Sequence, residues 1–300
     1  MEIKEGYINF LDFKTYYRIV NPSGKKTPLL MLHGGPGSTH NSFELFDHFA
    51  YDDDRPIIMY DQLGCGKSVI ESGHTSLWTK ETWVKELENL RKNLNLDKIH
   101  LFGHSWGGML EIIYMCDYAP LGIKSVTLSS TLSSASLWKE ECHRLISLID
   151  PKVQEIIYKY EALDDFSSQE AKDCINYYYN KFVFGKRTIG VDPECLTRTK
   201  PDSSESYISA WGKSEFAPSG TLKDYEYTDK LKNIVCPVLI CSGANDESTP
   251  YQNKVMFDSI GSTNKKWCLY QHSRHQSYYE EHDLYIKNLQ EFLNECDKND

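Results

Sequence analysis

Residues 99–108, IHLFGHSWGG, give the clearest indication of the fold of this 300-residue chain. Its apolar start, residues 99–102, predicts a buried strand, and the residues after it show helical spacing. Between them, Gly103, Ser105 and Gly107 form the pattern G-x-S-x-G in a strand–turn–helix context. The glycines allow a sharp turn and remove side chains that would clash, so the serine hydroxyl projects above the sheet. This context favours a nucleophilic Ser105 over a plain tight turn.

Working outward, short apolar runs alternate with segments of helical spacing. Continuous apolar strands that alternate with helices are typical of a mostly parallel sheet covered by helices on both faces. The first twenty residues instead alternate in polarity, which predicts two antiparallel strands turned at Leu11-Asp12. The expected buried strands are residues 28–32, 56–60, 99–102, 123–128, 235–241 and 266–270. The expected helices include residues 83–94, 110–118, 251–260 and 279–296.

Residues 131–231 interrupt this alternation. Helical spacing dominates there and buried-strand signals vanish, whereas the composition does not change. We therefore expect an α/β core formed by residues 1–130 and 232–300, with residues 131–231 as a helical insertion.

Composition and charge narrow the class of protein. The chain is 40% hydrophobic and 25% charged, which excludes disorder and a coiled coil. It contains no apolar run of 18 residues or more, and its start, MEIKEGYINF, lacks the features of a secretory signal. The nine cysteines are scattered singly, which is typical of reduced thiols in a cytoplasmic protein. A net charge of −10 argues against nucleic acid or an anionic membrane as partner, and the oligomeric state stays open.

A second glycine-rich loop, His33-Gly34-Gly35-Pro36-Gly37, follows the first strand of the expected parallel sheet. An oxyanion hole needs two backbone N–H groups aimed at one point. We assign these donors to Gly35 and to Trp106, the residue after the nucleophile. An ordinary strand-end turn is the alternative, and a phosphate site is disfavoured because no Lys-Ser/Thr follows the glycines.

A serine nucleophile needs a base, and the base needs an orienting carboxylate. In chains with this serine turn the acid and then the histidine follow on loops after late strands. Asp246 comes directly after the strand that ends at Cys241 and fits the acid position. For the base we favour His275, because the loop must return over the serine. His272 is the second choice, and His282 is expected to be a solvated helix residue.

These motifs resemble those of the proline iminopeptidases. The resemblance rests on HGGPG at 33–37, YDQLGCGKS at 60–68, GHSWGG at 103–108 and the late Asp-Glu pair, and it spans nearly the whole chain. It points to the branch of short archaeal and Firmicute-type enzymes that includes the tricorn-interacting aminopeptidase. The resemblance implies an α/β-hydrolase fold with a helical cap and a serine exopeptidase that releases one residue, preferentially proline, from a peptide N-terminus.

The same resemblance implies how the substrate is held. A free ammonium group would be bound by Glu215 of the cap and by Glu247, next to Asp246. Carboxylates near the acyl site would reject N-blocked chains through charge-assisted hydrogen bonds. The implied substrates are short peptides or aminoacyl amides with a free N-terminus. No cofactor is expected, and no metal site, because HExxH and Cys/His sets are missing from the sequence.

Other functions are compatible with parts of this sequence. An amino-acid amidase or esterase would use the same residues on small aminoacyl amides. A non-catalytic receptor usually lacks a member of the Ser–His–Asp set, and haloalkane dehalogenases and epoxide hydrolases place aspartate at the position of Ser105. Tyr177, Tyr178 and Tyr179 are candidates for a proline pocket, although tyrosines at helical spacing are more often ordinary packing.

Overall fold

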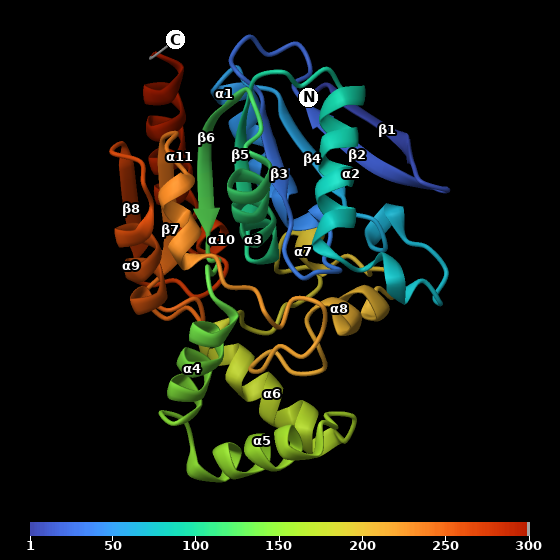
Figure 1. Ribbon diagram of the computed structural model, residues 1–300, viewed down its shortest axis with the longest axis vertical. Coiled ribbons are helices and arrows are strands. Elements are labelled where there is room, and N and C mark those ends of the chain that lie inside the picture. Colours follow the sequence, from blue (N-terminus) through green and yellow to red (C-terminus); the bar gives the residue numbers. More distant parts are fainter. Residues whose placement is uncertain (299–300) are drawn as a thin grey trace.

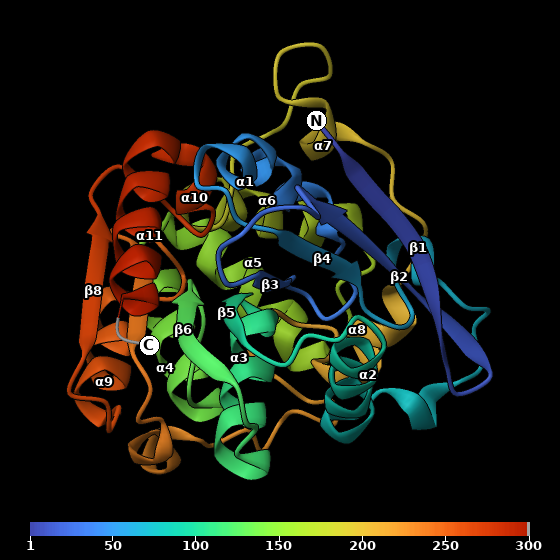
Figure 2. The same cartoon turned by 90° about the horizontal axis from the view of Figure 1, so that it is seen from above.

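One twisted sheet organises the molecule (Figures 1 and 2). In the computed structural model, which describes residues 1–298, eight strands lie in the order β1-β2-β4-β3-β5-β6-β7-β8. The first two strands are antiparallel to each other, β2 is antiparallel to β4, and the other neighbours are parallel. The strands are β1 Ile3–Phe10, β2 Phe13–Val20, β3 Leu29–Leu32, β4 Ile57–Asp61, β5 Ile99–His104, β6 Ile123–Ser129, β7 Val238–Gly243 and β8 Lys265–Tyr270.

Helices cover both faces of the sheet, as the apolar strands predict. Successive side chains of a strand point to opposite faces, so Leu30 of β3 packs in one hydrophobic cluster and Met31 in the other. Helices α2, α3 and α9 contribute to the first cluster, and α1, α10 and α11 to the second. These helices are α1 Asp47–Asp52, α2 Lys80–Asn93, α3 Trp106–Ile113, α9 Pro250–Ser259, α10 Ser277–Glu280 and α11 His282–Asp297. The expected α/β fold with a mostly parallel sheet is confirmed.

The segment between β6 and β7 is helical and lies beyond the carboxyl ends of the parallel strands (Figure 1). Within residues 131–231, all of which the structure describes, no segment joins the sheet, and one isolated bridge pairs Ser134 with Glu226. The helices are α4 Ala135–Ile146, α5 Pro151–Leu163, α6 Gln169–Phe182, α7 Glu194–Thr197 and α8 Ser204–Ala210. The division into a core and a cap at these residues stays a prediction.

Two expected elements have different bounds in the structure. Strand β7 begins at Val238 rather than at residue 235, after Pro237, which has no N–H to donate to the sheet. The expected closing helix is divided into α10 and α11 at Glu281. The Glu281 carboxylate accepts hydrogen bonds from the His272 backbone N–H (2.9 Å) and the Ser273 hydroxyl (2.6 Å). Glu281 thus holds the loop that precedes the break.

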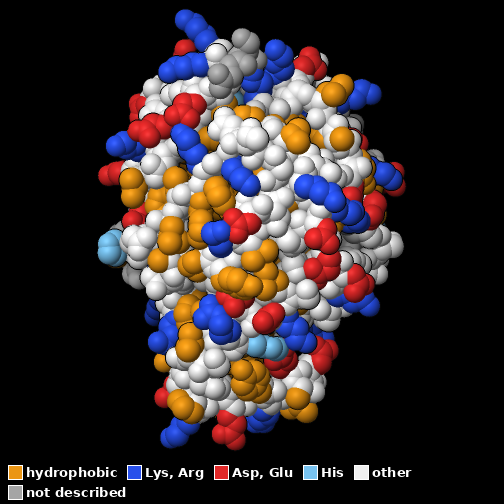
Figure 3. All heavy atoms as spheres, turned by 60° about the vertical axis from the view of Figure 1, so that its left-hand side comes forward, with side chains coloured by type: hydrophobic (Ala, Val, Ile, Leu, Met, Phe, Trp, Pro, Cys, Tyr) orange, Lys and Arg blue, Asp and Glu red, His pale blue; other side chains and the backbone are white. Residues whose placement is uncertain are grey.

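Charged side chains of both signs are interspersed on the face shown in Figure 3, with hydrophobic side chains gathered between them. Basic side chains are thus present on this face even though the net charge of the chain is −10. Within residues 1–298, no helix combines the length and the apolar character needed to cross a bilayer.

Candidate active site

Ser105 occupies the sharp turn between β5 and α3. Its backbone has φ 54° and ψ −121°, a conformation that a residue with a side chain rarely adopts. The flanking glycines make the turn possible. A Cβ atom on Gly103 would lie 2.5 Å from the Gly107 backbone, and one on Gly107 would lie 1.9 Å from the Leu32 carbonyl oxygen. The turn expected from G-x-S-x-G is therefore present, and it lifts Ser105 above the carboxyl end of β5.

The loop after β3 passes directly beside this serine. A Cβ atom on Gly34 would lie 3.1 Å from the Ser105 Cβ, and Gly35 has φ 117°, which suits glycine alone. Trp106 is the first residue of α3. Among the residues that the structure describes, no hydrogen bond of the loops and turns uses the backbone N–H of Gly35 or Trp106. Both expected donors are thus near Ser105 and uncommitted.

Gln62, which follows β4, ties the two loops together. The Trp106 indole Nε1 donates to Gln62 Oε1 at 2.7 Å, and Gln62 Nε2 donates to the His33 carbonyl oxygen at 3.0 Å. His33 Nε2 in turn accepts from the Gln62 backbone N–H at 3.0 Å. Burial lowers the pKa of His33 to about 4, so this ring is neutral and can accept. These bonds fix the position of the glycine-rich loop relative to α3.

His275 and Asp246 are paired. His275 Nδ1 lies 2.7 Å from Asp246 Oδ1, which also accepts from the Ser248 backbone N–H at 2.8 Å. Both side chains are buried. Burial alone would lower the pKa of His275, but the Asp246 carboxylate, together with the charges of Glu215 and Glu280, outweighs it and raises that pKa above 6.5. Asp246 therefore stabilises an imidazolium at this position.

The other two candidate histidines lie elsewhere. The His272 side chain is exposed and does not line the cavity around Ser105. His282 is the first residue of α11, and its Nδ1 lies 2.8 Å from the Tyr278 carbonyl oxygen. Of the three, only His275 is brought to Ser105.

The end of α6 is hydrogen-bonded to the two loops that carry Asp246 and His275. The Phe182 carbonyl oxygen accepts from the Glu247 backbone N–H at 3.1 Å, and the Val183 carbonyl oxygen accepts from the His275 backbone N–H at 3.2 Å. On the other side, a Cβ atom on Gly243 would lie 2.3 Å from the Ser273 carbonyl oxygen, so the histidine loop packs tightly on β7. The inserted segment thus helps to position the Asp246–His275 pair.

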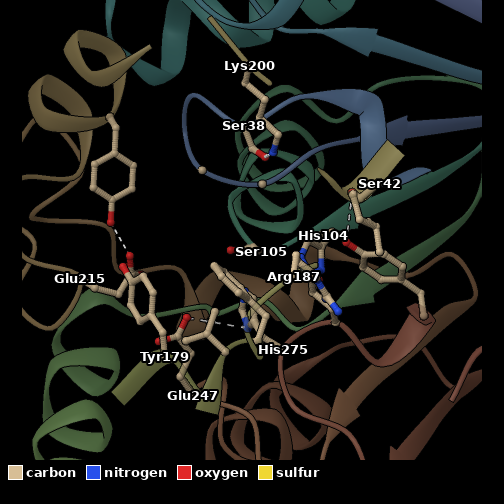
Figure 4. A pocket seen from close by; sticks show the side chains of 18 of the residues that line it. Ser38, Ser42, His104, Ser105, Tyr179, Arg187, Lys200, Glu215, Glu247 and His275 are labelled. Carbon is tan, nitrogen blue, oxygen red and sulfur yellow. Dashed lines mark hydrogen bonds and ion pairs between the residues drawn. The ribbon is translucent and has the colours of Figure 1, made fainter. Parts of the chain in front are cut away.

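A cavity of about 260 Å³ unites these groups (Figure 4). Its lining includes Ser105, His275 and Gly35 from the core, and Glu215 from the inserted segment. The further lining residues that matter below are Ser38, His104, Tyr179, Arg187, Lys200, Tyr207, Glu247 and Gln276. A volume near the low end of ligand pockets suits one or two amino-acid residues rather than a folded protein.

Two carboxylates, Glu215 and Glu247, face this cavity, and within residues 1–298 no lysine or arginine forms an ion pair with either. Burial raises the pKa of Glu215, although hydrogen bonds from Tyr207 and Tyr179 and the nearby His275 favour its charged form. Burial also raises the pKa of Glu247 well above 4.5, and the charges of Glu215 and Asp246 raise it further. Glu247 Oε2 is buried without a hydrogen-bond partner among the described residues, and Oε1 lies 4.0 Å from His275 Nδ1. Such a pair provides a site for a positive charge.

Several residues around the site escaped the sequence analysis. His104 is buried with its ring 4.9 Å from that of His275, and burial lowers its pKa well below 6.5, so it packs as a neutral ring. Thr131 Oγ1 donates to the Ser105 carbonyl oxygen at 2.7 Å. Tyr179, for which helical spacing favours ordinary packing, lines the cavity instead. The position of His104 inside GHSWGG was the one local signal that could have drawn attention to it.

The sheet order, the serine turn and the Asp246–His275 pair together define an α/β-hydrolase. A family model described as the alpha/beta hydrolase fold matches residues 27–282. Among solved structures, VinJ superimposes with a TM-score of 0.87 at 27% identity, covering 98% of this chain and 99% of that one. A proline iminopeptidase from Mycobacterium smegmatis superimposes with a TM-score of 0.84 at 24% identity, covering 99% of each chain, and shows the fold.

Full-length relatives give the narrower family. The chain is 50% identical over 298 residues to a proline iminopeptidase from Lactobacillus helveticus, covering 99% of this chain and 100% of the relative. It is also 50% identical over 299 residues to one from Clostridioides difficile, with the same coverage. The chain therefore belongs to the proline iminopeptidase family of the α/β-hydrolases, which confirms the resemblance seen in its motifs.

Proposed function

We propose that the protein is a serine aminopeptidase that releases the N-terminal residue, preferentially proline, from short peptides through an acyl-enzyme. One observation carries this proposal: a small cavity holds Ser105 and His275 together with the two buried carboxylates of Glu215 and Glu247. The names of the relatives agree with it. A hydrolase whose substrate carries no charge near the acyl carbon would not need two carboxylates in its pocket.

The first step is attack on the substrate carbonyl. His275, oriented by Asp246, takes the proton of the Ser105 hydroxyl while the serine oxygen bonds to the carbonyl carbon of the first residue. The N–H groups of Gly35 and Trp106 stabilise the oxyanion that forms. Loss of one such donor in an enzyme of this kind slows the reaction by about 10²–10³-fold.

The intermediate then collapses. His275 gives its proton to the departing amine nitrogen, the scissile C–N bond breaks, and the first residue stays on Ser105 as an ester. Water repeats the sequence with His275 as base and frees the residue. The raised pKa of His275 fits a group that must carry this proton between the two half-reactions.

The two carboxylates select the end of the peptide. Glu215 and Glu247 bind the substrate ammonium, and an N-blocked chain would not supply the positive charge that compensates these two buried carboxylates. Residues 131–231 act as the cap that supplies Glu215 and encloses the acyl residue. We further assign the protein to the cytoplasm, because its nine cysteines carry no disulfide in the structure.

The experiment is a panel of aminoacyl arylamides and simple acyl esters assayed with the wild type and with Ser105→Ala. The wild type should prefer the proline arylamide, and Ser105→Ala should lower kcat by at least about 10⁴-fold because the nucleophile is removed. The unfolding temperature of Ser105→Ala serves as the control for folding.

Two outcomes would contradict the proposal. Near-wild-type turnover by Ser105→Ala would exclude an acyl-enzyme on this serine. Faster hydrolysis of the other aminoacyl arylamides or of the simple acyl esters than of the proline arylamide would favour the amidase or esterase alternative.

A further inference from the structure

The cavity carries opposite charges on different sides of Ser105. In Figure 4, Glu215 and Glu247 lie on one side of the serine, whereas Lys200 enters from another direction next to Ser38. Arg187 is the second cation in the lining. The two carboxylates are already assigned to the substrate ammonium, but the mechanism above uses neither cation.

The two cations differ in their partners. Arg187 is occupied: its Nη2 donates to Gln276 Oε1 at 2.5 Å, its Nη1 lies 3.8 Å from Asp192 Oδ1, and its guanidinium lies over the Tyr279 ring. Lys200 Nζ reaches only the Ser38 hydroxyl, at 3.5 Å. Within residues 1–298 no carboxylate forms an ion pair with it. Lys200 is therefore the cation that is available to a ligand.

The surroundings of Lys200 show that its ammonium is directed inward. Burial lowers the pKa of this ammonium more than the attraction of Asp61 raises it, although the residue as a whole is exposed. The Lys200 side chain lines the cavity and points toward Ser38 (Figure 4), so its ammonium lies at the cavity wall. A bound anion would compensate that desolvation.

The backbone around Lys200 is held against the glycine-rich loop. Two residues earlier, Arg198 forms an ion pair with Glu44 at 2.6 Å, and three residues later the Ser203 hydroxyl donates to the Gly37 carbonyl oxygen at 2.5 Å. Pro201 follows directly and disfavours a helical conformation at Lys200. Lys200 is thus placed over the loop that carries Gly35, an expected oxyanion donor.

We propose that Lys200 is a specificity-determining residue that binds the C-terminal carboxylate of dipeptide and tripeptide substrates. This inference rests on the proposed aminopeptidase function. When the substrate ammonium lies at Glu215 and Glu247 and its first carbonyl lies at Ser105, the rest of the substrate must extend away from these two carboxylates. In a dipeptide or tripeptide, that chain ends in a carboxylate after one or two residues, which Lys200 meets with opposite charge.

The test compares each peptide with its C-terminal amide. The substrates are Pro-Gly and Pro-Gly-Gly, each as the free acid and as the amide, and the measured quantity is the ratio of kcat/KM for acid over amide. The wild type should favour the acids by about tenfold, the size of one charge-assisted hydrogen bond, and added salt should reduce this ratio. Lys200→Gln should bring the ratio close to one, and Lys200→Arg should restore part of it.

Lys172→Gln is the matched control, because Lys172 is exposed on α6, outside the cavity, and the substitution removes the same charge. Its ratio should equal that of the wild type. An unchanged ratio in Lys200→Gln would overturn the assignment, as would a ratio that falls only in Arg187→Gln. A proline arylamide assay separates the two levels: no proline release by the wild type would refute the proposed function, whereas release without an effect of Lys200→Gln would refute this inference alone.

Discussion

Ser105, Asp246 and His275 show what can be read from individual residues. Each belongs to a short local pattern, a G-x-S-x-G turn or a loop directly after a strand. Such patterns can be recognised from the sequence without knowledge of the tertiary structure. His275 needed one further argument, that its loop must return over the serine, and the structure brings His275 rather than His272 to the cavity. The catalytic roles of these residues stay predictions that mutation can test.

The pH dependence of activity tests the role of the Asp246–His275 pair. A base must be neutral, and the pKa of His275 is raised above 6.5, so kcat/KM should fall as the pH decreases through a value above 6.5. Ionisation of Glu247, whose pKa is also raised, acts in the same direction because the ammonium site needs its charge. The measurement is kcat/KM for a proline arylamide between pH 5 and 9.

Asp246→Asn tests the contribution of the Asp246 charge, which raises the pKa values of both His275 and Glu247. The substitution removes the charge that raises the pKa of His275, so kcat at saturating substrate should drop by about 10⁴-fold, as in other serine peptidases with this change. The remaining activity should lose its acid limb at a lower pH than in the wild type. An acid limb below pH 6.5 in the wild type, or a limb that Asp246→Asn leaves in place, would contradict the assigned roles.

At the scale of elements, continuous apolar runs located the strands because both faces of this sheet are buried. The features that the sequence did not predict depend on contacts between residues that are far apart in the sequence. The break between α10 and α11 at Glu281 accompanies hydrogen bonds to His272 and Ser273, which no periodicity reveals. Tyr207 and Lys200 lie in the inserted segment, where helical spacing and loops give no indication of which side chains face the cavity. Their roles require the packing of that segment on the sheet.

The packing of α3 on β3 gives a prediction about Gly107. A Cβ atom there would lie 1.9 Å from the Leu32 carbonyl oxygen, so Gly107→Ala must move the helix away from the strand. We expect the free energy of unfolding to fall by about 1–3 kcal/mol, the usual cost of overpacking, and kcat to fall with the displaced Ser105. Denaturant unfolding and a proline arylamide assay measure the two effects.

Gly185→Ala is the control for this substitution. Its Cβ would lie 3.4 Å from the Arg274 guanidinium, an ordinary van der Waals distance, so its stability should stay within about 0.5 kcal/mol of the wild type. Equal stability losses in the two variants would show that the contact with Leu32 is not what requires glycine at residue 107.

On the scale of the whole molecule, the site exists only where the sheet and the inserted segment meet. The sheet carries Ser105, Glu247 and His275, while the inserted segment carries Glu215 and Lys200 and holds two of the loops through the end of α6. The general plan of an α/β core with a helical insertion followed from the sequence. The pairing of Glu215 with Glu247 came from the family resemblance, because nothing local distinguishes these two residues among 43 acidic ones.

Recognition of a free N-terminus by Glu215 and Glu247 can be tested with one ratio of kcat/KM values. The measurement is kcat/KM for a proline arylamide divided by kcat/KM for its N-acetyl form, in the wild type, Glu215→Gln and Glu247→Gln, with Glu170→Gln on the exposed side of α6 as the control. The account predicts a large ratio in the wild type and the control, and a loss of at least about tenfold in each of the other variants, because each removes one charge-assisted contact with the ammonium. An undiminished ratio in both Glu215→Gln and Glu247→Gln would contradict it.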